Sequence, residues 1–230
     1  MTLGHSGSDI ELPIEGGKLS GYVAVPASGR GPGVLVLHEA WGLVDHVRDV
    51  CDRLARAGFV ALAPDLYGGR VAEDLPEARR LASELESERV GADLDAGVAA
   101  LLNHDGVDGP RVGVVGFCMG GHLALLAATR NARVSAAVDF YGVLPHLPLD
   151  LSGLDAAVLA IFAENDEHIG AEAVEALRAA FRSAGKRATF HVQPGVRHAF
   201  MNDARPDRHD AAAAAEGWDR MLAFLRAELS

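Results

Sequence analysis

A cysteine flanked by glycines is the residue of this chain best suited to nucleophilic chemistry. Cys118 lies within Gly116–Gly121, which reads GFCMGG and matches the G-x-nucleophile-x-G pattern of a nucleophile elbow, with cysteine where serine is usual. The sharp turn from strand to helix strains the nucleophile backbone, so the residues two positions away must be small. A helix N-terminus also favours a thiolate. The alternative interpretation is that Cys118 is a small, buried, hydrophobic residue.

Two later loops supply an acid and a histidine in the order that such a site requires. Each should follow the nucleophile along the chain, in a loop after a strand. Asp166 follows the apolar run Ala157–Ala163 and is the predicted acid, with Glu164 as the second choice; the competing interpretation is that these carboxylates are solvated charges at a helix start. His198 follows the last predicted strand. We expect it to accept the thiol proton through one ring nitrogen while Asp166 holds the other.

An oxyanion hole is the remaining requirement of acyl transfer. One backbone N–H normally comes from the residue after the nucleophile and the other from the loop after an earlier strand. Met119 and Ala40 occupy these two positions. Each donor aimed at a developing oxyanion is worth about 3 kcal/mol, so we expect both amides to face the site of attack by Cys118.

The elements that must position these residues alternate between strands and helices. Continuous apolar runs such as Gly33–His38 are typical of strands buried on both faces, and the alternation predicts a mostly parallel sheet with right-handed crossovers. The sequence thus predicts an α/β-hydrolase fold, with an N-terminal antiparallel hairpin and helices on both faces of the sheet. The predicted strands are Ser8–Pro13 and Lys18–Val25 (joined by Glu15–Gly17), Gly33–His38, Phe59–Ala63, the run from Arg111 to the elbow, Val134–Phe140, Ala157–Ala163 and Ala188–Val192. The predicted helices are Asp45–Ala57, Pro76–Glu86, Val90–Asn103, the elbow helix to about Arg130, Ala171–Ala184 and Asp210–Leu229.

Composition narrows the class of protein further. With 230 residues and 49% hydrophobic content, the chain fits one domain spanning residues 1–230. A net charge of −11 argues against nucleic acids and anionic membranes as partners, since both require a basic patch. Two cysteines, Cys51 and Cys118, indicate a reduced cytoplasmic setting rather than a disulfide framework. Met1–Glu11 does not resemble a signal peptide, and no apolar run reaches membrane-spanning length.

Together these segments resemble the dienelactone hydrolase family, the carboxymethylenebutenolidase-like branch of the α/β-hydrolases with a cysteine nucleophile. The cysteine elbow and the Glu39 loop are the most specific parts of a resemblance that covers nearly the whole chain. The matching segments are His38–Leu43 (HEAWGL), Pro64–Tyr67 (PDLY), Gly116–Gly121, Phe140–Val143 (FYGV), the Asp166 loop and His198–Asp203 (HAFMND).

The resemblance implies a reaction and further site residues. It implies hydrolysis of an enol-lactone through an acyl-cysteine intermediate, without metal or cofactor, on a small-molecule ester or lactone substrate. It also implies that Glu39 keeps the resting thiol protonated and helps to remove that proton once substrate enters, because a neighbouring anion disfavours ionisation of a thiol. Such gating would protect Cys118 from oxidation. The alternative for Glu39 is an ion pair with a nearby arginine.

Two departures separate this chain from the dienelactone pattern. The family grips the substrate carboxylate with two arginines, whose positions fall near Leu75 and at Asn202 in this chain. Loss of both cations would remove a bidentate anchor for an anionic lactone. The candidates to replace them are Arg79, Arg80, Arg197 and Arg205.

Three aromatic residues are expected to line the substrate pocket, although each could instead pack at its rim. They are Trp41, Tyr141 and Phe200. The main hypothesis is a cofactor-independent hydrolase of a lactone or carboxylic ester. The alternatives are a general carboxylesterase, thioesterase or acyl-transfer enzyme of different acyl specificity, and a non-catalytic thiol sensor on the same fold. The natural substrate, the pathway and the oligomeric state (monomer or small homo-oligomer) do not follow from the sequence.

Overall fold

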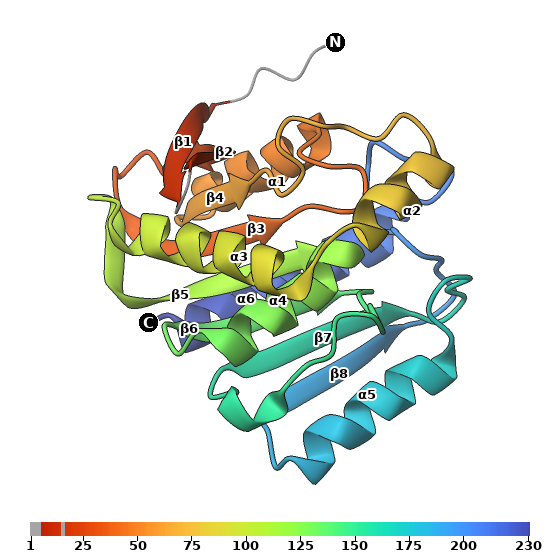
Figure 1. The fold of residues 1–230 in the computed structure, drawn as a ribbon. Coiled ribbons are helices and arrows are strands. Elements are labelled where there is room, and N and C mark those ends of the chain that lie inside the picture. Colours follow the sequence, from red (N-terminus) through yellow and green to blue (C-terminus); the bar gives the residue numbers. More distant parts are fainter. Residues whose placement is uncertain (1–5, 15–16) are drawn as a thin grey trace.

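A twisted sheet of eight strands forms the centre of the computed structural model, which describes residues 6–14 and 17–230 (Figure 1). The strand order is β1-β2-β4-β3-β5-β6-β7-β8. Strands β3 to β8 run parallel to one another, whereas β1 and β2 are antiparallel to their neighbours. The strands are β1 Ser8–Ile14, β2 Gly17–Ala24, β3 Gly31–Leu37, β4 Val60–Pro64, β5 Val107–Phe117, β6 Val134–Phe140, β7 Ala157–Ala163 and β8 Ala188–Gln193.

The predicted N-terminal hairpin is present at one edge of the sheet. Ser8 pairs with Val23 and Ile14 with Gly17 in antiparallel register. The turn expected at Glu15–Gly17 falls in part outside the described residues, since Glu15 and Gly16 are not among them. The mostly parallel sheet of the predicted α/β-hydrolase fold is therefore confirmed, together with its antiparallel addition.

Helices cover both faces of the sheet. In Figure 1, α3, α4 and α5 lie in front, and α6 passes behind. The guanidinium of Arg53 on α1 stacks over the Trp218 ring on α6 at 4.0 Å, which joins these two helices behind the sheet. None of the helices in the described part of the chain combines the length and apolar character needed to span a bilayer. The helices are α1 Asp45–Arg56, α2 Leu75–Ser83, α3 Ser87–Leu102, α4 Met119–Arg130, α5 Ala171–Ser183 and α6 Ala211–Glu228, with one short 3-10 turn at Leu151–Gly153.

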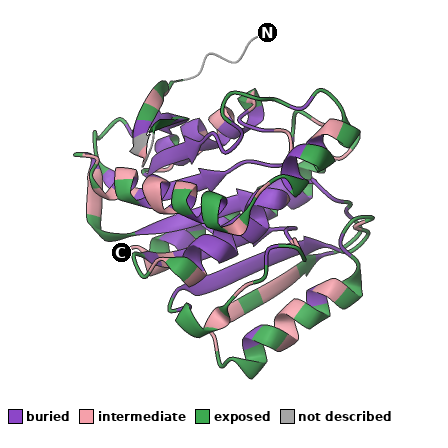
Figure 2. Cartoon of the chain, in the orientation of Figure 1, coloured by how far each residue is buried: buried purple, intermediate pink, exposed green. Residues whose placement is uncertain are grey.

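The hydrophobic core lies along the central strands, where every residue of β4 and β7 is buried (Figure 2). Burial on both faces is what the continuous apolar runs of these strands predict. The predicted element boundaries differ from the observed ones by a few residues, and the largest difference is at β5, which begins at Val107 rather than at Arg111. The breakers Gly109 and Pro110 are accommodated by a register shift between β3 and β5, so pairing resumes ahead of them at Gly31 and Val107.

The carboxyl ends of the parallel strands lie at one edge of the sheet, and the candidate site residues lie in the loops that follow these strands. The loops after β3, β5, β6, β7 and β8 begin at His38, Cys118, Tyr141, Glu164 and Pro194. Ligand sites of open α/β sheets form outside these strand ends. Because the five loops come from neighbouring strands, residues far apart in the chain meet there.

Candidate active site

Cys118 occupies a strained turn between β5 and α4. Its backbone lies at φ 54° and ψ −119°, outside the usual region for a residue with a Cβ. Only three non-glycine residues in the described part of the chain have positive φ, namely Cys118, Tyr141 and Ala199, and all three line the same pocket. Strain of this kind persists where the surrounding structure enforces it, and it is characteristic of functional sites.

The glycines of the elbow are required by close backbone contacts. A Cβ added to Gly116 would lie 1.8 Å from the carbonyl oxygen of Gly120, and one added to Gly120 would lie 2.2 Å from that of Leu37. No side chain fits at either distance. The GFCMGG pattern therefore reflects the packing of strand, turn and helix against each other, as the sequence predicted.

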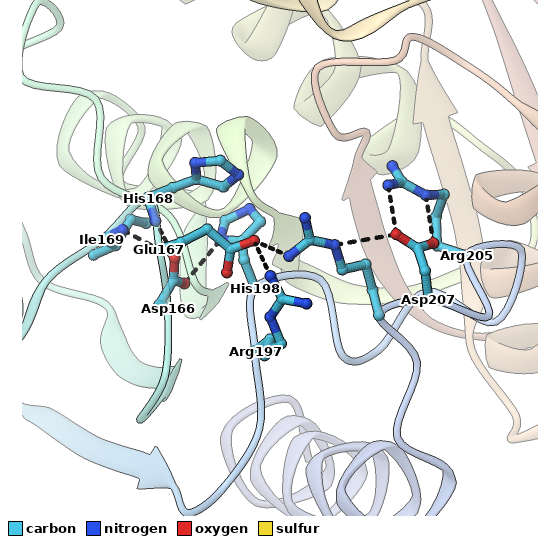
Figure 3. Close-up of polar contacts among 9 residues, drawn as sticks. Asp166, Glu167, His168, Ile169, Arg197, His198, Arg205 and Asp207 are labelled. Carbon is cyan, nitrogen blue, oxygen red and sulfur yellow. Dashed lines mark hydrogen bonds and ion pairs between the residues drawn. The ribbon is translucent and has the colours of Figure 1, made fainter.

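The predicted acid and histidine meet at the ends of β7 and β8. The Nδ1 atom of His198 lies 2.8 Å from Oδ2 of Asp166, whose side chain is only 1% exposed (Figure 3). The other oxygen of Asp166 accepts hydrogen bonds from the backbone N–H groups of His168 and Ile169. Glu164, the second choice, instead accepts from the N–H of Gly195. Of the two carboxylates, Asp166 is the one that orients the imidazole.

The electrostatics of the pair favour its charged form. Burial lowers the pKa of His198, but the hydrogen bond to Asp166 and the interactions with Cys118 outweigh burial and raise this pKa from 6.5 to about 10. Burial likewise opposes the charged form of Asp166, and the contributions of His198 and of the two loop amides outweigh it, so the pKa of Asp166 is lowered. The interactions on the two sides of the ring, with the Asp166 carboxylate and with Cys118, thus favour the protonated form of His198.

Both expected oxyanion donors belong to the lining of the Cys118 pocket. The backbone N–H of Cys118 itself is engaged by the carbonyl of Phe140 at 2.9 Å. Within the described chain, the N–H groups of Met119 and Ala40 donate to no other residue. Free amides beside a nucleophile are the donors that a tetrahedral oxyanion needs.

Glu39 faces the same pocket and has an amide partner rather than an arginine. Its side chain is buried, and Oε2 accepts a hydrogen bond of 2.7 Å from the Asn202 side chain. Its Oε1 and the Tyr141 hydroxyl are both buried, and neither makes a hydrogen bond of standard geometry with another described residue. Burial, followed by the charges of Glu39 and Cys118, raises the pKa of Tyr141 well above 10. The alternative interpretation of Glu39, an ion pair with a nearby arginine, is therefore not supported among the described residues.

Two of the three expected aromatic residues line the pocket, and the third does not. Trp41 and Tyr141 belong to the lining, and the Tyr141 ring packs edge-on to the His198 ring at 4.9 Å. The prediction for Phe200 is wrong. Its side chain is fully buried behind Tyr141 and points toward Gly217 on α6, because the chain turns through the positive φ of Ala199 just before it.

Three arginines line the pocket: Arg79 on α2, and Arg205 and Arg208 in the loop before α6. Arg205 pairs with Asp207 (Figure 3). Its guanidinium also lies over the Trp41 ring. Arg208 pairs with Glu167 and Asp207. Arg79 has no hydrogen bond or ion pair with another described residue, which leaves its guanidinium free for a ligand.

The other two arginine candidates lie outside the pocket lining. Arg80 is held by Glu77 and Glu84 on the exposed side of α2. Arg197 pairs with Glu167 (Figure 3). Their neighbours in sequence, Arg79 and His198, take the inward positions instead, so only Arg79 and Arg205 of the four predicted candidates face the site.

The pocket has a cavity volume of ≈ 290 Å³, and its lining includes the catalytic candidates and apolar residues of α2 and of the loop after β6. His168 and Arg208 also line the pocket and were not among the predicted site residues, since their only signal in the sequence is their position in the loops of the site. Among residues 6–14 and 17–230, no cluster of three or more His, Cys, Asp or Glu side chains could hold a metal ion. The apolar lining is formed by Leu75, Ala78, Ala82, Val143, Leu144 and Ile169.

The fold and the elbow, with a histidine and an acid on the following loops, define an α/β-hydrolase. The chain belongs to the dienelactone hydrolase family, which it matches over residues 19–229. A relative from Methylorubrum extorquens, provisionally named carboxymethylenebutenolidase, is 36% identical over 95% of this chain and 80% of its own length. One of the same provisional name from Escherichia coli K12 is 36% identical over 94% and 84%. A crystal structure from Klebsiella pneumoniae, provisionally named dienelactone hydrolase, superposes with a TM-score of 0.88 at 34% identity, covering 96% of this chain and 98% of that one.

This membership confirms the predicted family and class of enzyme. The chain is a hydrolase acting on ester bonds, with a small molecule as its substrate.

Proposed function

We propose that this enzyme hydrolyses a lactone or carboxylic ester through an acyl-cysteine intermediate on Cys118. The observation that carries the proposal is the hydrogen bond of His198 Nδ1 with Asp166 Oδ2, 2.8 Å long, at the cavity into which the strained Cys118 turn opens. The raised pKa of His198, about 10, supports a resting imidazolium next to sulfur. Such a pair supplies the thiolate that attacks and the proton that the leaving group requires.

The reaction follows in two steps. The Cys118 thiolate attacks the carbonyl carbon, and the oxyanion is stabilised by the N–H groups of Met119 and Ala40. Collapse of this intermediate breaks the carbon–oxygen bond; the leaving oxygen takes the proton from His198, and a thioester to Cys118 remains. Water then attacks the thioester while neutral His198 accepts its proton, and release of the thiolate yields the acid and restores the imidazolium. Asp166 holds the ring in one orientation throughout.

We further propose that the substrate is a small lactone or ester that carries a negative charge. A cavity of ≈ 290 Å³ suits a compact substrate. The free guanidinium of Arg79 lies on the α2 side of this cavity, one helical turn beyond the Leu75 position where the family arginine falls. Arg79 can therefore replace one of the two missing cations, which favours the dienelactone-like substrate over a neutral ester.

Turnover assays with two substrate types test the mechanism. The parent enzyme should hydrolyse a dienelactone and, more slowly, a neutral aryl ester, whereas Cys118→Ala and His198→Ala should lose at least about 10³-fold in kcat. If the reaction with the aryl ester is quenched before the acyl-enzyme is hydrolysed, one equivalent of phenol should be released per enzyme. Mass spectrometry should then show the added acyl group on Cys118. Full activity in either variant would contradict the mechanism. Hydrolysis of aryl esters alone would instead favour the general carboxylesterase.

A further inference from the structure

The peptide bond between Glu39 and Ala40 carries one of the two proposed oxyanion donors. Because a trans peptide is planar, its C=O and N–H groups point in opposite directions. Whatever holds the Glu39 carbonyl therefore also sets the direction of the Ala40 N–H. Ala40 lies in a loop that follows β3, so its own secondary structure does not fix this direction.

The Glu39 carbonyl is held by the ring of His38. The Nδ1 atom of His38 lies 2.7 Å from this carbonyl oxygen, which also accepts a hydrogen bond of 3.2 Å from the N–H of Gly42. The opposite ring nitrogen, Nε2, accepts from the backbone N–H of Leu66 at 3.2 Å. A backbone N–H can only donate, so Nε2 carries no proton and Nδ1 must carry it. The ring thus donates to the Glu39 carbonyl.

The surroundings of His38 keep the ring neutral and fixed. The side chain is fully buried and packs edge-on to Tyr67 at 4.9 Å. Burial lowers the pKa of His38, against smaller raising contributions from the Glu39 carbonyl and Asp65. The ring therefore links the loop after β3 to the loop after β4 through two directed hydrogen bonds, a role that an apolar side chain of the same size could not perform.

We propose that His38 is a positioning residue of this hydrolase, whose Nδ1–H holds the Glu39 carbonyl so that the Ala40 N–H points at the substrate oxyanion. The inference rests on the proposed function, because it needs Ala40 to be an oxyanion donor. It assigns the histidine directly before Glu39 to transition-state stabilisation, although this ring does not line the pocket.

Two substitutions of His38 distinguish the role of Nδ1 as a donor from the role of Nε2 as an acceptor. His38→Asn keeps an amide donor near the position of Nδ1 and gives up the acceptor for Leu66. His38→Gln keeps an acceptor near the position of Nε2 and gives up the donor to the Glu39 carbonyl. With an aryl ester, His38→Gln should lower kcat by about 10- to 100-fold with little change in KM, below the 10²- to 10³-fold loss of a complete oxyanion donor. His38→Asn should retain most of the parent kcat.

The affinity for a trifluoromethyl ketone provides a second measurement. Its adduct with a thiol is a tetrahedral oxyanion, so its Ki should rise in His38→Gln in proportion to the fall in kcat. Equal kcat values for the Asn and Gln variants, whether both unchanged or both reduced, would overturn the role of the donor. So would a change confined to KM. Cys118→Ala, assayed in parallel, distinguishes failure of the His38 role from failure of the proposed function. If Cys118→Ala stays active, the proposed acyl-cysteine mechanism is wrong.

A measurement on the unmodified enzyme keeps the inference testable if the variants fold poorly. Nitrogen-15 NMR of the parent should show His38 as a neutral imidazole with the proton on Nδ1 throughout pH 5 to 9. A proton on Nε2, or titration of the ring within this range, would overturn the inference regardless of how the variants behave.

Discussion

In the proposed mechanism, the charges of His198 and Glu39 have opposite effects on ionisation of the Cys118 thiol. The imidazolium favours a thiolate, whereas the buried carboxylate of Glu39 favours a protonated thiol. Asn202 is a neutral partner of Glu39, so it orients the carboxylate without cancelling its charge. In the proposed mechanism, a substrate that displaces or screens Glu39 would therefore favour the attacking thiolate.

Removal of the Glu39 charge should make the resting thiol more reactive. In Glu39→Gln we expect iodoacetamide to alkylate Cys118 several-fold faster at pH 7, because the anion that disfavours the thiolate is gone. The rate is followed by mass spectrometry, which distinguishes Cys118 from the buried Cys51. Glu172→Gln, at an exposed position on α5, is the matched control and should alkylate at the parent rate. Equal rates for Glu39→Gln and the parent across pH 6 to 9 would contradict gating by this carboxylate.

Helix α2 places Arg79 in the lining of the pocket, where the proposed anionic substrate would bind. Arg79 and Arg80 are adjacent, yet one lines the pocket and the other pairs with glutamates on the exposed side. Arg79→Gln should raise KM for an anionic lactone about tenfold and leave KM for a neutral aryl ester within twofold, since only the anion loses a charged partner. Arg80→Gln is the control and should leave both values unchanged. Equal effects on the two substrates would show that Arg79 does not bind a charge.

The elbow itself makes a prediction about stability. Gly120→Ala places a Cβ 2.2 Å from the Leu37 carbonyl, so β3 and α4 must separate and the protein should lose about 3 kcal/mol or more of unfolding free energy. Gly170→Ala, at the start of α5, meets nothing within 4 Å and should stay within about 0.5 kcal/mol of the parent. Denaturant titrations provide both values. A stable, fully active Gly120→Ala enzyme would contradict the close packing of α4 against the end of β3.

The strands and helices, and the order of the site residues along the chain, could be predicted because local sequence patterns indicate both. Apolar runs marked the strands, and the loops that follow them contained Asp166 and His198 in the required order. What local patterns do not record is the direction of a side chain within a loop. Phe200 was misplaced for this reason, since the positive φ of Ala199 turns it inward. The choice between Arg79 and Arg80 likewise depended on the rotation of α2.

Two histidine–aspartate hydrogen bonds connect the segment between β8 and α6 to other parts of the molecule. His198 bonds Asp166 after β7, and Asp203 bonds His46 on α1 at 2.9 Å. The hydrogen bond from His46 is the largest cause that lowers the pKa of Asp203. The pKa of Asp166 is lowered as well, with burial outweighed by its hydrogen bonds. Both carboxylates are therefore more stable ionised in the folded state than in the unfolded chain.

This linkage predicts how folding stability depends on acid. A carboxyl with a lowered pKa stabilises the fold above its ordinary value of 3.8, and the contribution is lost as the pH falls through the lower folded value. Asp166→Asn and Asp203→Asn should thus cost unfolding free energy at pH 6, on the order of 1–3 kcal/mol for the buried Asp166, and much less at pH 3. Urea titrations at both pH values measure the difference.

Asp93 provides a control of opposite sign. Burial raises the pKa of this residue on α3, so its charge is unfavourable in the folded state above the ordinary value. Asp93→Asn should therefore increase the unfolding free energy at pH 6 and have no effect at pH 3. If each of the three variants changed the unfolding free energy by the same amount at pH 6 as at pH 3, the two histidine–aspartate pairs would stabilise the fold through packing rather than through charge. The site loop would then be held by its hydrophobic contacts alone, and acid would not release it before the core unfolds.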